Sequence, residues 1–521
     1  MPGGKERVMI PFPWPSFPAL VAEYAARTPQ RPAVFHPLRT MTYAELAQEA
    51  AAAAHLLQDM GVRHGDRVGC LVRKTPEAIA AYLGIQALGA IFFPLDANQP
   101  PAVLRDLLTR LSPRAVVLCA SHAGLWDTLG APHLPRLVLP HPDHELPTPH
   151  TAPCCRFWTE LEGVRLPMPL PPDDDDTPVY MNFTSGSTGR PKGALTTLGN
   201  IHWNSLASVE HFRMTGDDVH LCMMPSFVHP HELFARPLAQ GGALALMDGI
   251  DPRTIVDTIR RFNVTCFMAV AAIYETLIRQ HEHAPFDLES LRVAESGGMH
   301  VPAALSREFR NRLGVRLLPV WGSTETTGIA MATPLEEDPS FPAGATGRPL
   351  PQYLVEILDE HGEPVRDGAV GELHVSGPGV CREYYHMPLE SAESFVIRPD
   401  GTARFRTRDL VSRTPDGAVM FHSRMQGMLK VAGMKVYPTR IEELLHEHPA
   451  VAQAVVVRMH DPLRGEAPRA VVALRPGQEA TPRELWRWLE ARLHRFALPR
   501  VIDIVDAIPK TPGGKIAWKE L

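Results

Sequence analysis

Residues 179–193 read VYMNFTSGSTGRPKG, an apolar run that leads into a loop of glycine, serine and threonine with one lysine. Glycines let a backbone approach a phosphate group closely, and hydroxyl and amide groups donate hydrogen bonds to its oxygens. Lys192 adds a positive charge. The segment is not a Walker A loop, because that motif requires serine or threonine after the lysine and Gly193 stands there. The composition favours a strand followed by a phosphate-binding loop, and a solvent-exposed loop is the alternative.

The residues before this loop alternate between helical and strand patterns. Thr42 and Glu45 form a predicted capping box that begins a helix ending near Met60. Strands are predicted at 67–72, 90–95 and 115–120, and a second helix at 76–88. This βαβ order implies a largely parallel sheet covered by helices.

Residues 78–95 are the most apolar part of the chain. Gly84, Gln86, Gly89 and Pro94 interrupt them, which argues against a membrane span. We therefore predict a buried helix that runs into a buried strand.

The patterns change in the second half of the chain. Alternating strands and helices continue to about residue 350, after which the strands become short and turn-rich. The last 95 residues indicate a compact α+β unit, with capping boxes predicted at Thr439–Glu442 and Thr481–Glu484. The expected fold is α/β, with a large N-terminal domain (1–425) of βαβ-type sheets plus a small β-rich section, and a small α+β C-terminal domain (426–521).

The composition limits the class of function. Apolar residues make up 45% of the 521 residues and the net charge is −6, so a large core is expected and a basic surface for nucleic acid or an anionic membrane is not. Seven cysteines without a CxxC pair fit a reducing compartment, and the N-terminus has no apolar leader segment. We expect a cytoplasmic protein with no nucleic-acid partner and no membrane span.

The whole loop resembles the signature loop of the adenylate-forming superfamily, [YF]-T-S-G-[ST]-T-G-x-P-K-G. This superfamily contains acyl-CoA synthetases, nonribosomal peptide adenylation domains and luciferase-like enzymes. Further segments resemble the motifs of this superfamily in the same order along the chain. These are WGSTE (321–325) for YGxTE, RTRD (406–409) for YxTGD with Arg408 in place of glycine, SRMQGMLKVAG (423–433) for GRxDxxIKxxG, and PKTPGGKI (509–516) for PxTxxGK[IV].

The resemblance implies a two-step reaction that uses ATP and Mg²⁺. A carboxylate attacks the α-phosphorus of ATP, pyrophosphate leaves, and an acyl-adenylate forms. A second nucleophile then takes the acyl group. Because an anion must approach an anion in the first step, cations and oriented donors have to neutralise both.

The resemblance also implies a role for each matching residue. Lys515 is expected to bridge the substrate carboxylate and the α-phosphate, and Glu325 to bind Mg²⁺. Asp409 is expected to accept hydrogen bonds from the ribose hydroxyls, and Arg424 to contact the nucleotide near the ribose. The phosphates are assigned to Thr184, Ser185, Gly186, Ser187, Thr188, Gly189, Lys192 and Thr324. The adenine is assigned to Gly297, Gly298 and Trp321, and further nucleotide contacts to Gly322, Ser323 and Lys430. The catalytic set is Lys515, Glu325, Thr184 and Arg424.

The second half-reaction implies a mobile C-terminal domain. By resemblance this domain rotates between the half-reactions, and its 425–433 loop replaces Lys515 at the active site. Gln426 stands at the hinge position, where the superfamily usually has aspartate or lysine. A hinge needs only to tolerate two backbone states.

The acid is predicted to lack an α-amine. Amino-acid-activating relatives carry an aspartate for the substrate ammonium, and Phe227 stands at its place in the best alignment. A buried ammonium without a counter-ion is costly. An aryl, fatty or other carboxylic acid is expected, in a pocket lined by Phe227, Val228, His229, Val270, Met299 and Val320.

The acceptor must come from outside, because the chain has no carrier segment of the LGGxS type. Coenzyme A is the first choice. The alternatives are the phosphopantetheine thiol of a carrier protein and an amine, which would make the protein an amide ligase. A regulator that binds adenylate without catalysis is a further alternative, and Thr184, Glu325, Asp409 and Lys515 together argue against it.

Overall fold

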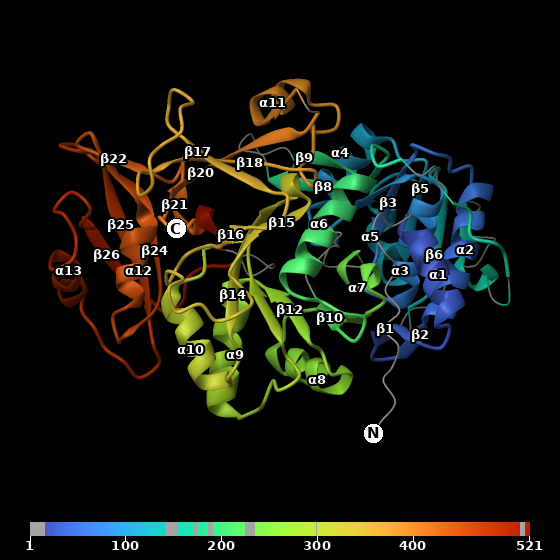
Figure 1. The fold of residues 1–521 in the computed structure, drawn as a ribbon, viewed down its shortest axis with the longest axis horizontal. Coiled ribbons are helices and arrows are strands. Elements are labelled where there is room, and N and C mark those ends of the chain that lie inside the picture. The colour runs from blue at the N-terminus through green and yellow to red at the C-terminus, as the bar shows by residue number, and fades with distance from the viewer. Residues whose placement is uncertain are drawn as a thin grey trace.

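The structure is a computed structural model. It describes residues 16–141, 154–161, 163, 165–170, 174–185, 191–223, 235–298, 300–399, 401–510 and 516–521, without the side chains of Ser185 and Lys519. The chain forms two large sheets, a smaller β-rich section and a C-terminal unit (Figure 1), and its first two strands belong to the second large sheet. This architecture confirms the predicted fold class.

The first sheet has seven strands in the order β7-β6-β5-β3-β4-β8-β9. All of its neighbours pair in parallel except β8 and β9, which form an antiparallel pair. Its inner strands are continuous apolar runs because helices cover both faces. The strands are β3 (Arg67–Leu71), β4 (Ile91–Pro94), β5 (Ala115–Cys119), β6 (Arg136–Leu139), β7 (Cys155–Phe157), β8 (Pro178–Ser185) and β9 (Pro191–Thr197).

Two helices from the first hundred residues pack tightly together. The predicted capping box of Thr42 and Glu45 is present and begins α2 (Tyr43–Asp59). The apolar 78–95 segment forms α3 (Pro76–Ala87), which is buried almost all round, followed by strand β4. A Cβ on Gly84 would lie 2.9 Å from the Ala50 carbonyl oxygen, so glycine allows the close approach of α3 to α2. The prediction of a buried helix and strand is confirmed.

The second sheet has nine strands in the order β16-β15-β14-β13-β12-β10-β11-β1-β2. It shares one hydrophobic core with the first sheet, and α3 contacts strands of both. The strands are β1 (Pro32–His36), β2 (Arg39–Thr42), β10 (Val219–Cys222), β11 (Ala243–Leu246), β12 (Cys266–Ala269), β13 (Val293–Ser296), β14 (Leu317–Ser323), β15 (Gly328–Ala332) and β16 (Arg348–Pro349).

Helices flank these sheets. They are α1 (Phe17–Arg27), α4 (Pro101–Leu111), α5 (Ala123–Asp127), α6 (Leu198–His211), α7 (Arg236–Ala239), α8 (Pro252–Phe262), α9 (Ala271–His283) and α10 (Ala303–Leu313). No helix within the described ranges has the length and apolar character needed to cross a bilayer. The seven cysteines, all of them described, are thiols and not disulfides.

The β-rich section is a five-stranded antiparallel sheet in the order β17-β18-β20-β19, with β21 beside β20. The short α11 (Pro388–Ser394) precedes β19. The strands are β17 (Leu354–Leu358), β18 (Gly371–Ser376), β19 (Phe395–Ile397), β20 (Ala403–Arg413) and β21 (Val419–Arg424). Within β20, Arg408 has a φ of +62°, the left-handed region that favours glycine. The departure from the family pattern at this position therefore places a strained residue directly before Asp409.

Replacing Arg408 tests this strain. Arg408→Gly and Arg408→Ala both remove the exposed ion pair with Glu393, whose atoms lie 3.3 Å apart. Only glycine relieves the positive φ, so we expect the glycine variant to be more stable than the alanine variant by about 1 kcal/mol. Chemical denaturation of the two variants measures the difference, and an alanine variant of equal or greater stability would contradict it.

The C-terminal unit has its own sheet and core. Strands run in the order β23-β22-β25-β24, with β26 parallel to β25, and α12 and α13 pack on the sheet. Figure 1 shows this unit beside α9 and α10. The elements are β22 (Leu429–Val431), β23 (Met434–Val436), α12 (Pro438–His446), β24 (Val451–Asp461), β25 (Gly465–Leu474), α13 (Pro482–Glu490) and β26 (Val501–Val505).

One of the two predicted C-terminal capping boxes is present. Thr481 and Glu484 cap α13 as predicted, with Pro482 at its first position. The capping box predicted at Thr439–Glu442 is wrong: α12 begins at Pro438, and Thr439 lies inside the helix. Proline sets this start because its fixed φ suits the first helical position and its missing N–H is not needed there. Glu442 is therefore free for another contact, described below.

Candidate active site

The β8–β9 hairpin presents the first predicted residues. Thr184 of β8 pairs with Lys192 of β9 in the antiparallel register. Lys192 is only 9% exposed, and its ammonium lies 4.9 Å above the ring centroid of Tyr384. Four further predicted residues, Gly186, Ser187, Thr188 and Gly189, lie outside the described residues, as does the Ser185 side chain.

Glu325 sits in a single helical turn after β14, Thr324–Thr326. Ser323 and Thr326 cap this turn reciprocally, which fixes the backbone of Thr324 and Glu325. The Glu325 carboxylate is 7% exposed and accepts a hydrogen bond of 2.7 Å from the Tyr384 hydroxyl. Burial and the Glu325 charge raise the pKa of Tyr384 well above its usual range, so this hydroxyl is a donor.

Asp409 is the centre of a second cluster. The indole N–H of Trp321 donates to one carboxylate oxygen at 2.8 Å, and the Arg424 guanidinium lies 2.8 Å from the other. Asp409 is 2% exposed, whereas the Arg424 side chain is 68% exposed. Burial raises the pKa of Asp409, although the Arg424 charge opposes the shift. Strands β14, β20 and β21 thus bring three predicted nucleotide residues together.

A cavity of about 950 Å³ opens beside this cluster. This volume is in the range of small-molecule sites. The predicted residues Gly298, Val320, Trp321, Gly322, Asp409 and Arg424 line it. Gly297 lies behind them, where a Cβ would come within 2.8 Å of Val320. Val270 is buried in the core beneath Gly298, while Phe227, Val228, His229 and Met299 lie outside the described residues.

The opposite wall of the cavity comes from the C-terminal unit. Ile508, Lys510, Ile516 and Trp518 line it, so the described residues on both sides of positions 511–515 border the cavity. Lys515 itself lies outside the described residues. Lys430 is exposed on the β22–β23 hairpin, and it is not among the lining residues that the structure describes.

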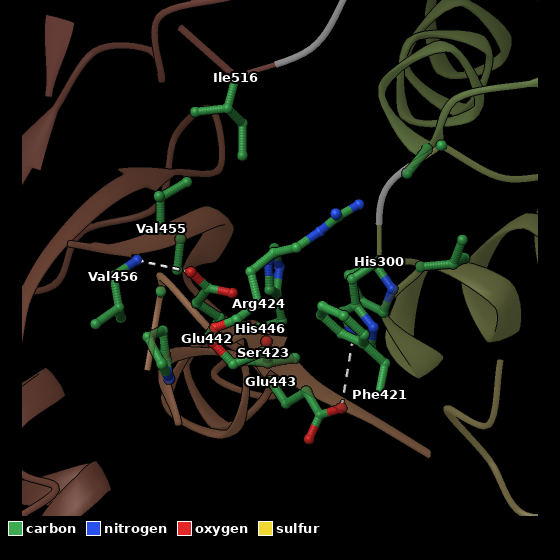
Figure 2. Close-up of a pocket in the computed structure, with 18 of the residues that line it drawn as sticks. His300, Phe421, Ser423, Arg424, Glu442, Glu443, His446, Val455, Val456 and Ile516 are labelled. Atoms are coloured by element: carbon green, nitrogen blue, oxygen red, sulfur yellow. Dashed lines mark hydrogen bonds and ion pairs between the residues drawn. The ribbon is translucent and has the colours of Figure 1, made fainter. Parts of the chain in front are cut away.

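Glu442 is a cavity residue that the sequence analysis missed. Figure 2 shows it on α12, where its carboxylate accepts a hydrogen bond of 2.7 Å from the Val456 N–H. Burial raises the pKa of the Glu442 carboxyl to about 7 and lowers the pKa of the neighbouring His446 to about 4. The Pro438 that begins α12 was the sequence signal for this placement, because it moves Glu442 away from the capping position.

Ionic contacts join the C-terminal unit to α9, α10 and the loop between β13 and α10. His300 lies 3.4 Å from Glu443 (Figure 2). Lys510 lies 3.7 Å from Glu275 of α9, and Arg475 lies 3.1 Å from Glu308 of α10. These contacts hold the C-terminal unit with Lys510 and Ile516 toward the cavity.

Comparisons with known proteins identify the family of the chain. The family model "AMP-binding enzyme" matches residues 21–385, and "AMP-binding enzyme C-terminal domain" matches residues 440–515. An indoleacetate–CoA ligase of Aromatoleum aromaticum is 31% identical over 503 residues, covering 95% of each chain. The crystal structure of ATP-bound MatB from Rhodopseudomonas palustris superposes with a TM-score of 0.84 at 27% identity, covering 96% of this chain and 98% of that one.

A solved structure of an enzyme that is named for a different acceptor is also similar. The amide bond synthetase McbA from Marinactinospora thermotolerans has a TM-score of 0.83 at 26% identity, covering 97% of this chain and 98% of that one. The predicted superfamily is confirmed. The chain therefore belongs to the AMP-binding enzyme family and is an AMP-forming acid ligase.

Proposed function

We propose that the protein activates a carboxylic acid lacking an α-amine with ATP, and then transfers the acyl group from the acyl-adenylate to the thiol of coenzyme A. The observation that carries this proposal is the Asp409 cluster at the edge of the cavity. A buried carboxylate held by Trp321 and Arg424 is suited to a ribose diol, since its oxygens accept more than one hydrogen bond each.

The phosphate end would be formed by Lys192 and Glu325. Mg²⁺ in nucleotide sites takes one or two carboxylates and completes its shell with substrate phosphates and water. The described residues hold no group of three or more potential metal ligands. The buried carboxylate of Glu325 would therefore be one protein ligand of a Mg²⁺ ion that binds together with ATP. Mg²⁺ supplies positive charge against the phosphate oxygens.

The walls of the cavity favour an apolar acid. Ala271, Ala272, Val301 and Val320 line it on the N-terminal side. The name of the indoleacetate–CoA ligase supports an aryl acid. The carboxylate of Glu275 also lines the cavity, but Lys510 pairs with it.

Coenzyme A is the preferred candidate for the acceptor, because the similar indoleacetate–CoA ligase is named for it. An amine is the second candidate, and two observations favour it: the similarity to an amide bond synthetase, and Gln426 at the hinge position. A carrier-protein thiol is the third. Location in the cytoplasm follows from the cysteine content and stays a prediction.

We place the boundary between the two domains at Gln426. Strand β21 ends at Arg424 and β22 begins at Leu429, so the intervening residues belong to neither sheet. Rotation about this point would withdraw the 511–515 segment and bring the β22–β23 hairpin, with Lys430, toward the cavity. We propose that the described orientation is the one used in the adenylation step, because Lys510 and Ile516 line the cavity in it.

A screen of carboxylic acids tests the proposal. Pyrophosphate release or hydroxamate formation is measured with ATP and Mg²⁺ over a panel of aryl, fatty and amino acids. We expect release with an acid that lacks an α-amine, and then an acyl-CoA by mass spectrometry when coenzyme A is added. If an amide formed with amino acids and no product formed with coenzyme A, the assignment of coenzyme A as the acceptor would be overturned. If no acid in the panel gave pyrophosphate release, the proposed function would be overturned.

A further inference from the structure

The segment Cys381–Tyr385 runs between the two halves of the phosphate site. The Cys381 N–H donates to the Glu325 carbonyl at 2.8 Å. The Tyr385 N–H donates to the carbonyl of Gly193 at 2.8 Å, directly after Lys192. One short backbone segment therefore fixes the distance between the β9 strand and the turn that holds Glu325.

The side chain of Tyr384 contacts both charged residues. Its hydroxyl donates to Glu325 Oε1 at 2.7 Å, and its ring lies 4.9 Å from the Lys192 ammonium. Tyr384 is 3% exposed. A cation over an aromatic face is attracted by the ring, most strongly where water is excluded.

The tyrosine ring is itself held in place. The Tyr384 N–H donates to the Ser391 hydroxyl at 2.9 Å, and the ring packs against Phe395 with centroids 5.1 Å apart. The ring is therefore a fixed part of the site.

Opposite charges that are buried close together attract each other strongly, because little water screens them. Nevertheless, none of the described ion pairs joins Lys192 to Glu325, and each contacts the tyrosine instead. We propose that Tyr384 is a positioning residue that keeps Lys192 and Glu325 apart, so that the lysine faces the phosphates and the carboxylate faces the metal. This inference rests on the proposed function, which assigns phosphate and Mg²⁺ to these two residues.

The hydroxyl and the ring have separable roles. The hydroxyl orients the carboxylate, and the ring separates the two charges and supports the lysine. Tyr384→Phe removes only the first role, and Tyr384→Leu removes both. Tyr43→Phe is the matched control, because it deletes another buried tyrosine hydroxyl, one that donates to the Gly242 carbonyl at 2.8 Å and has no described contact with the turn that holds Glu325.

Isothermal titration calorimetry, without an acid substrate, tests the proposal. Three ligands are compared: ATP with Mg²⁺, ATP with EDTA, and AMP. We expect Tyr384→Phe to bind Mg²⁺–ATP about tenfold more weakly, the scale for losing a residue that orients a metal ligand, with AMP affinity unchanged. Tyr384→Leu should weaken ATP binding with and without the metal, and Tyr43→Phe should bind all three ligands like the wild type.

The outcomes separate the two proposals. If the parent protein binds ATP and AMP, and Tyr384→Phe binds Mg²⁺–ATP with wild-type affinity, then only the proposed role of Tyr384 is overturned. An equal loss for AMP and ATP in Tyr384→Phe would also overturn it, because the effect would then not be specific to the phosphate end. Failure of the parent protein to bind ATP or AMP would overturn the proposed function itself.

Discussion

Replacing Lys515 with alanine is expected to slow ATP–pyrophosphate exchange by about 10²–10³-fold, the scale for losing one donor that stabilises developing charge. The physical reason is that a carboxylate and a phosphate of like charge must approach each other. Lys510 and Ile516, which flank the segment that carries Lys515, line the cavity opposite the Asp409 cluster. Exchange assays with the best acid from the screen measure the effect.

Two controls accompany this variant. Acyl transfer from preformed acyl-adenylate should be much less affected than exchange, because the adenylate is then already made. Lys435→Ala removes an exposed lysine of the same domain, on β23, and should leave exchange unchanged. Exchange near the wild-type rate in the Lys515 variant would refute its assignment.

Asp409→Asn is expected to raise the KM for ATP by about 10–100-fold. A hydrogen bond to a charged group contributes about 1.5–3 kcal/mol, and 1.4 kcal/mol corresponds to a factor of ten. The variant also leaves Arg424 without its carboxylate partner. ATP titration at saturating acid gives the KM.

Glu372→Gln is the matched control for Asp409. Glu372 lies in the same sheet, is buried, and pairs with Arg406 at 2.9 Å, but it is not among the described residues that line the cavity. Both variants lose a buried carboxylate, and only the Asp409 variant should bind ATP more weakly. Equal KM values in the two variants would show that the Asp409 carboxylate does not bind nucleotide.

Local signals predicted much of the fold. The capping boxes at Thr42 and Thr481 depend on residues three positions apart, and the apolar strands depend on composition over a few residues. Both signals are complete within a short segment, so the sequence alone contains them. The error at Thr439 has the same origin: the spacing matched a capping box, but Pro438 set a different helix start.

Contacts between distant segments could not be predicted in this way. The motifs indicated Trp321 and Asp409 separately, but the 2.8 Å hydrogen bond between them crosses 88 positions and depends on how two sheets pack. Tyr384 contacts Glu325 and Lys192 across 59 and 192 positions along the chain. Nothing in the residues around Tyr384 indicates such contacts, because they arise from tertiary packing.

Because the two large sheets share one core, the two ends of the nucleotide site are expected to unfold together. Lys192 is carried by the seven-stranded sheet and Trp321 by the nine-stranded one, while α3 contacts both sheets. Neither sheet can melt without exposing apolar surface of the other. Partial loss of the pocket on heating is therefore disfavoured, and the capacity to bind ATP should vanish in the same cooperative step as the N-terminal structure.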